Sequence, residues 1–292
     1  MTSTPAFEDE LHQPLSASRT WFNRGMTILA FTLTTLAILP LFSIVLEILR
    51  QGIGQLTPET LFSLPAPVGL EDEPNGFANA IVGTLLMVGI AALISVPFGV
   101  MTGIFLSEIG KNSILSKGIR FVIVILSSIP SVIFGVFAYG VIVLTTGQFS
   151  AFAGGFALSM IMLPIVALTT EESLKLVPQS YRLASAALGG ARFQTIFKVI
   201  IPAALPAVTT GILLAVSRAA GETAPLMFTA LFSQFWAEGL MSPTASMPVL
   251  IYTYASSPFK EQNQMAWTAA LVLLIMVLIS NGLSRWVTSK RK

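Results

Sequence analysis

Long apolar runs separated by short polar stretches dominate this chain. A helix needs about 20 consecutive, mostly apolar residues to cross a bilayer core. Six segments reach that length: residues 25–49, 78–106, 119–145, 149–170, 204–232 and 265–287. Pro40, Pro97, Pro130 and Pro164 fall inside these runs, where neighbouring helices must satisfy the backbone carbonyls that the prolines free. The pattern therefore predicts an all-α membrane protein: a packed, kinked bundle of six transmembrane helices.

The composition excludes several other classes of protein. Hydrophobic residues make up 54% of the chain and charged residues only 10%, against about 25% charged residues in soluble domains. The net charge of +2 is too small to suggest nucleic-acid binding. The chain has no cysteine, which rules out disulfide and thiolate chemistry. The single histidine, His12, lies in a polar N-terminal stretch, so we expect no metal site.

The positions of lysine and arginine predict the orientation, because these residues favour the cytoplasmic side of a membrane. With both termini inside, Arg50 and Lys260 lie outside and Arg218 lies within the fifth apolar run. The other thirteen of the 16 basic residues then lie inside. The predicted organisation is a disordered cytoplasmic tail (1–24), a first helix (25–49), an extracytoplasmic loop (50–77), a core (78–287) with an inner loop (171–203), and a basic tail (288–292).

The inner loop reads as two short helices joined by a turn. A helix can start after Pro178, and the glycine pair at 189–190 can stop it. One interpretation is an interfacial helix pair that stabilises the bundle. The other is a docking element that transmits force from a cytoplasmic partner. The loop resembles the EAA loop of ABC-importer permeases: Ala184, Gly189 and Pro202 match, while Leu183 replaces the acidic residue. The resemblance implies ATPase coupling by Tyr181, Arg182, Ala184, Leu188, Gly189 and Arg192.

The stretch RAAGETAP, residues 218–225, places an arginine and a glutamate inside an apolar run. Residues i and i+4 share one helical face, so Arg218 and Glu222 can neutralise each other. One interpretation is an ion pair that fixes helix register. The other is an anion pathway, because charged residues in membrane helices face the bundle interior or an aqueous cavity, and a guanidinium suits phosphate oxygens. The hydroxyls of Thr223 and Ser131 are further pathway candidates, although each can instead bond within its own helix.

RAAGETAPLMFTA closely resembles the RAxGETAP motif of the phosphate-specific ABC importer permeases. Residues 79–108 and 129–140 (IPSVIFGVFAYG) resemble other segments of that family. The resemblance implies a type I importer (MetI-like) permease fold and transport of inorganic phosphate into the cytoplasm across the plasma (inner) membrane. The implied partners are an ABC ATPase homodimer, a PstC-type sister permease and an extracytoplasmic phosphate-binding protein. The modest 50–77 loop favours the PstA type over the PstC type.

No GxxxxGK[ST] sequence occurs in the chain. We therefore expect a non-catalytic pore subunit without a cofactor of its own, with ATP bound and hydrolysed by the partner. Four alternatives stay open from the residues alone: a permease for sulfate or molybdate, the PstC-type sister subunit, an intramembrane enzyme that uses Glu222 or Ser131, and a structural anchor for an ATPase.

Overall fold

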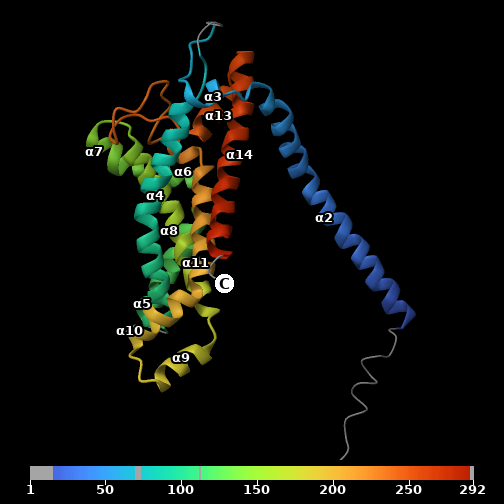
Figure 1. The fold of residues 1–292 in the computed structure, drawn as a ribbon, viewed down its shortest axis with the longest axis vertical. Coiled ribbons are helices and arrows are strands. Elements are labelled where there is room, and N and C mark those ends of the chain that lie inside the picture. Colours follow the sequence, from blue (N-terminus) through green and yellow to red (C-terminus); the bar gives the residue numbers. More distant parts are fainter. Residues whose placement is uncertain (1–15, 70–73, 112, 290–292) are drawn as a thin grey trace, which may run out of the picture. The chain divides into compact units, whose positions relative to one another are not determined.

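The computed structural model describes residues 16–69, 74–111 and 113–289, and all regular structure in these ranges is helical (Figure 1). The chain divides between Arg50 and Gln51 into two compact units. Residues 1–15 with His12, and residues 290–292 of the predicted basic tail, lie outside the described residues.

The first unit consists of one long helix, α2 (Ala17–Gly52), up to Arg50. It begins at Ala17, so it includes residues 17–24 of the predicted tail. Its middle section is apolar on all sides, and the side chains there are exposed. A helix that is apolar all round is typical of a segment surrounded by lipid or by other transmembrane helices.

The second unit is a helical bundle. Its α-helices are α3 (Pro58–Phe62), α4 (Ala78–Ile104), α5 (Ile114–Ser128), α6 (Ser131–Ala138), α7 (Leu144–Thr146), α8 (Ala151–Lys175), α9 (Gln179–Ala187), α10 (Arg192–Thr195), α11 (Ile201–Ala220), α12 (Ala224–Met227), α13 (Met247–Ala255) and α14 (Lys260–Ser289). Three π-helical turns link neighbouring helices: Phe105–Ile109, Tyr139–Val143 and Ile196–Ile200.

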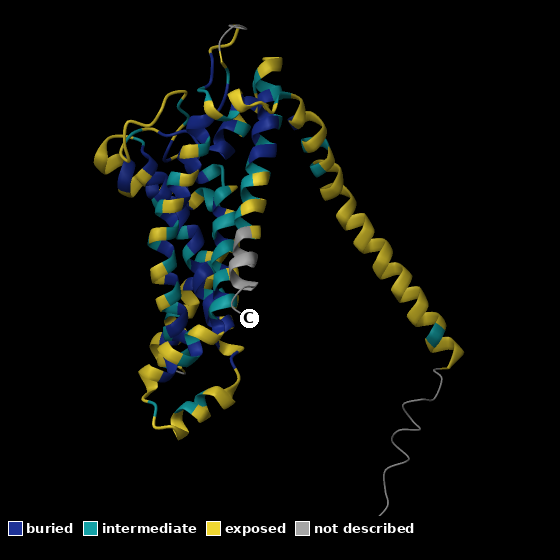
Figure 2. Cartoon of the chain, in the orientation of Figure 1, coloured by how far each residue is buried: buried dark blue, intermediate teal, exposed yellow. Residues whose placement is uncertain are grey.

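Helix α8 forms the centre of the bundle and carries buried residues along most of its length; Figure 2 colours the buried residues of the bundle dark blue. Helix α4 packs along α8. A Cβ atom on Gly103 would lie 2.6 Å from Cβ of Thr170, so the two backbones approach too closely for any larger residue. Small residues of this kind allow close helix packing in membranes, where van der Waals contact replaces the hydrophobic effect between helices.

The predicted six spans are recovered with two corrections to their boundaries. Five helical segments in the described ranges are long and apolar enough to cross a membrane, and a bent pair makes a sixth. The expectation of one helix over 119–145 is wrong, because α5 and α6 meet at 101° around Pro130. Proline lacks the N–H that a continuing helix needs and holds the preceding residue, Ile129, in an extended conformation.

The second correction concerns the span predicted at 204–232. The helical stretch starts earlier, at Arg192, and ends earlier, at Ala220. A separate short helix, α12, begins at Ala224 with Pro225 in its first turn, and residues 228–246 are mostly irregular. This irregular segment covers the start of α8, where the backbone amides of Ser150, Ala151 and Phe152 donate to carbonyl oxygens of the segment. The first amides of α8 are thus satisfied by protein.

A buried carboxylate links α8 to α5. The side chain of Glu171 is 0% exposed and pairs with Arg120 of α5, while its Oε1 lies 2.9 Å from Nζ of Lys175. Both cations are partly exposed. Because the carboxylate has no route to solvent, the two cations compensate a charge that would otherwise be buried alone.

This geometry predicts that removing the two cations lowers stability more than removing the carboxylate does. In Arg120→Gln/Lys175→Gln a buried carboxylate loses both partners, at a cost of about 3 kcal/mol, equivalent to about 5–10 °C of thermal unfolding. In Glu171→Gln the cations can turn to solvent, so we expect a smaller loss. Thermal unfolding of the purified protein in detergent measures both, and equal losses would contradict the proposed role of burial.

Candidate functional site

The predicted charged pair lies at a break between two helices. Gly221 ends α11, where its amide donates to the Arg218 carbonyl (3.1 Å), and α12 begins at Ala224. Nε of Arg218 lies 3.6 Å from Oε1 of Glu222, which is an ion pair at a separation longer than a hydrogen bond. The predicted ion pair is therefore present although the span ends earlier than predicted. It connects Arg218, in the last turn of α11, to Glu222, which follows the end of that helix.

The two charged side chains differ in exposure. The face of α11 that carries Ala204, Val208, Gly211, Ala215 and Ala219 is buried in the bundle. Arg218 lies in the last turn of α11, one turn beyond the exposed Leu214 at the edge of this face, and its side chain is 58% exposed. Glu222 is only 17% exposed. The arginine thus points to a surface that the described part of this chain leaves open.

A second helix break lies beside the first. Helix α6 packs against α12, and a Cβ atom on Gly135 would lie 2.6 Å from Cα of Pro225. Ser131 is the first residue of α6 and shares a helical face with Gly135, four residues on. The fold therefore places Ser131 and Thr223 at the starts of two helices that pack together, with Glu222 directly before the second helix and Arg218 in the last turn of α11. The hydroxyl of buried Thr229, by contrast, donates to the Pro225 carbonyl (2.8 Å).

The predicted inner loop forms two helices joined by a glycine turn. Helix α9 starts directly after Pro178, and Gly189 has φ +77°, a conformation that residues with a side chain rarely adopt. The hydroxyls of Ser185 and Thr195 lie 2.8 Å apart and join α9 to α10. The expectation of two short helices with a turn at Gly189 is confirmed.

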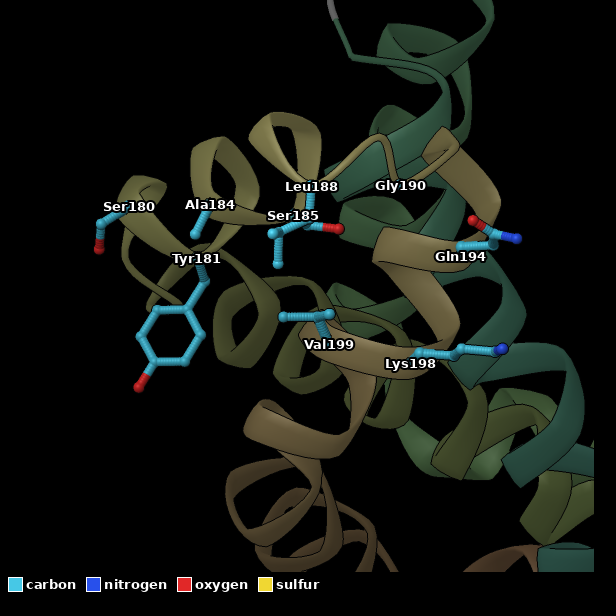
Figure 3. A pocket seen from close by; sticks show the side chains of 9 residues that line it. All are labelled: Ser180, Tyr181, Ala184, Ser185, Leu188, Gly190, Gln194, Lys198 and Val199. Carbon is cyan, nitrogen blue, oxygen red and sulfur yellow. The ribbon is translucent and has the colours of Figure 1, made fainter.

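The two helices enclose an open groove of about 590 Å³ (Figure 3). Three of the predicted coupling residues, Tyr181, Ala184 and Leu188, line it from α9, and Lys198 and Val199 line it from the facing segment. Leu188 is 90% exposed. Together with Tyr181, which is 51% exposed and lines the same groove, it forms an exposed apolar surface of the kind that marks protein contacts.

Arg182 and Arg192 behave differently from the other predicted coupling residues, because both bind their own chain. Arg182 pairs with Glu108, and Nη2 of Arg192 donates to the backbone carbonyls of Glu108 and Ile109. Sequence reasoning missed Glu108 and Gly135. The available signal for Glu108 was an acidic residue at the end of an apolar run, and for Gly135 a glycine following a proline break.

These features define the class: a membrane permease subunit with a charged pair at a helix break and a two-helix inner loop. The family model described as "Binding-protein-dependent transport system inner membrane component" matches residues 95–292, and the chain belongs to this family of inner membrane transport proteins. The predicted membrane location is thereby confirmed. The chain is therefore a component of a membrane transport system.

Within the family the chain groups with the PstA proteins. It is 44% identical to the phosphate transport system permease protein PstA of Yersinia pestis over 217 residues, 74% of each chain. It is 39% identical to the PstA of Haemophilus influenzae over 271 residues, 92% of this chain and 95% of the relative. These relatives confirm the predicted resemblance to PstA-type permeases.

The fold comparison agrees with the family. An inward-facing structure of the MetNI methionine ABC transporter superposes with a TM-score of 0.61 at 19% identity, covering 74% of this chain and 95% of the other. The predicted type I importer (MetI-like) permease fold is confirmed. The roles of the individual site residues remain predictions.

Proposed function

We propose that this chain is one of two pore-forming permease subunits of an ATP-driven importer that carries inorganic phosphate into the cytoplasm. The observation that carries the proposal is the Arg218–Glu222 pair, placed at a helix break on an open face of α11. Relatives that are 39–44% identical to this chain over the aligned residues are phosphate transport system permeases.

The geometry of the pair suits an ion that must be both held and released. At 3.6 Å the glutamate holds the guanidinium by charge without a close hydrogen bond, so the donors of Arg218 remain available to another acceptor. The planar guanidinium can donate two parallel hydrogen bonds to phosphate oxygens. Glu222 repels the same anion, and this repulsion opposes a tight capture that would stop conduction.

The open face of Arg218 implies that the pathway is completed by a second subunit. A charged side chain in a membrane protein is expensive unless it faces a bundle interior or an aqueous cavity. Since the described part of this chain leaves the arginine uncovered, we infer that a PstC-type sister permease lies across the pathway. The hydroxyls of Ser131 and Thr223, at the two adjacent helix starts, are the further ligands that we propose on this side.

The inner loop is the proposed docking site of an ABC ATPase homodimer, which would bind and hydrolyse ATP. The stretch from Arg192 to Ala220 is helical without a break, which corresponds to about 42 Å at 1.5 Å per residue. It joins the docking loop at one end to Arg218 at the other. A movement imposed at α10 therefore reaches the charged pair through one element. An extracytoplasmic phosphate-binding protein would deliver the ion.

The experiment is uptake by the assembled complex in vesicles. We expect ATP-dependent accumulation of labelled phosphate that a tenfold excess of unlabelled phosphate suppresses and a tenfold excess of sulfate or molybdate does not. Equal accumulation of labelled sulfate would favour the alternative of another oxyanion. Phosphate accumulation that needs no ATP would contradict the importer assignment.

A further inference from the structure

Arg182 is the most extensively bonded charged side chain of the inner loop, and it points into the bundle. Only 18% of the side chain is exposed. Its Nη2 lies 2.5 Å from Oε1 of Glu108, and its Nε lies 3.4 Å from Oε2 of the same carboxylate. Its Nη1 donates to the Val177 carbonyl (2.6 Å), and Nη2 also donates to the Leu174 carbonyl (3.1 Å). One guanidinium thus makes four polar contacts.

These contacts join three elements at the inner end of the bundle. Arg182 belongs to α9, and Glu108 belongs to the π-helical turn that follows α4. Leu174 lies in the last turn of α8, and Val177 lies two residues beyond the end of that helix. The last carbonyls of a helix have no partner within the helix, and a cation at that position also interacts favourably with the helix dipole. Glu108 is only 10% exposed, so the ion pair is shielded from solvent.

A second tie runs from the other side of the glycine turn. Arg192 of α10 donates to the carbonyl oxygens of Glu108 and Ile109. Residues on both sides of Gly189 are therefore attached to the same end of α4. A displacement of α9 and α10 stretches these bonds unless the end of α4 moves with them.

We propose that the Arg182–Glu108 pair is the link through which movement of α9 reaches α4 and α8, with Arg182 as a positioning residue. The proposal rests on the function proposed above, because it assigns a transmission role within an ATP-driven permease. It differs from the sequence prediction, in which Arg182 acts on the ATPase. A guanidinium that makes four contacts with Glu108 and two carbonyls has little capacity left for a contact outside this chain.

The planar arrangement of the guanidinium's N–H donors explains why an arginine occupies position 182. A guanidinium has five N–H donors in a fixed plane, so it can serve a carboxylate and two carbonyls at once. A lysine ammonium is a compact point charge on a flexible stem. Arg182→Lys can therefore keep the charge opposite Glu108, but it cannot reproduce the planar set of contacts to all three groups.

The test compares transport with ATP hydrolysis in the reconstituted complete importer. We expect Arg182→Gln and Glu108→Gln each to lower the phosphate imported per ATP hydrolysed about tenfold, with complex assembly and basal ATP hydrolysis within twofold of wild type. The double variant should be no worse than either single variant, because the two residues act as one unit. Arg182→Lys should fall between wild type and Arg182→Gln. Lys111→Gln, which removes an exposed cation three residues from Glu108, is the matched control and should leave the ratio unchanged.

Two results would overturn the inference. One is an unchanged import-to-hydrolysis ratio in both Gln variants. The other is that the Gln variants lose ATP hydrolysis and import in parallel, or lose assembly, while Arg182→Lys behaves like wild type. That outcome would assign the pair to folding alone. Failure of the wild-type complex to import phosphate would instead contradict the proposed function, so the two failures are distinguishable.

Discussion

Arg218→Gln is expected to abolish phosphate uptake while assembly of the complex survives. The variant keeps a polar side chain of similar length but removes the permanent charge and the paired donors. Two charge-assisted hydrogen bonds contribute about 3 kcal/mol or more, and 1.4 kcal/mol corresponds to a tenfold change. We therefore expect a loss of about a hundredfold or more. The measurement is initial uptake of labelled phosphate in vesicles, with assembly checked by co-purification.

The controls separate the pathway from a structural ion pair. Arg218→Lys keeps the charge without the planar donors and should retain partial uptake. Lys260→Gln removes an exposed cation at the start of α14 and should transport normally. Loss of co-purification in Arg218→Gln would support the alternative that the pair only fixes helix register. Normal uptake in that variant would support a structural anchor without a pore.

Gly189→Pro is expected to uncouple ATP hydrolysis from transport. The turn requires φ +77° at this residue, whereas proline is fixed near −65°. Proline would also lose the amide that donates to the Ala186 carbonyl at 3.0 Å. The two helices of the docking loop should then lose their mutual orientation. Uptake should fall at least tenfold while basal hydrolysis by the complex continues, as measured by phosphate release and labelled uptake in the same vesicles.

Gly189→Asn is the matched control at the same position. Asparagine tolerates a left-handed backbone and keeps its amide, so coupling should be largely preserved. Transport at the normal rate in Gly189→Pro would show that the turn has no part in coupling. Equal loss in the proline and asparagine variants would assign the effect to the added side chain and not to the backbone.

Much of the fold followed from the sequence because membrane helices carry a strong signal. The apolar runs predicted the helices around α2, α4, α8 and α14, and the glycine pair at 189–190 predicted the inner turn. The helix breaks at Pro130 and Gly221 were harder to predict from the sequence. A proline inside an apolar run is compatible with a kinked helix as well as with a 101° bend, and neighbours that lie far away in the sequence decide between them.

The candidate site was predictable in its residues but not in its connections. RAAGETAP identified Arg218 and Glu222 by their charge. In contrast, nothing local predicted that Arg182 turns inward, since its partner Glu108 is 74 residues away along the chain. The same limit applies to Gly135, whose role is the close approach of Pro225. Long-range contacts of this kind depend on how the helices pack, which periodicity does not encode.

The central claim is that Arg218 lines an aqueous route for an anion, and cysteine accessibility tests it most directly. The chain has no cysteine, so Arg218→Cys introduces one unique thiol in this subunit. In the complex reconstituted in lipid, a charged, membrane-impermeant thiol reagent should modify this cysteine in at least one of two conditions, with ATP or without it. A cysteine at exposed Ser256 should react in the same way, and one at buried Leu226 should not. If Arg218→Cys stays as unreactive as Leu226→Cys in every state, the side chain faces no water and the transport role assigned to it is wrong.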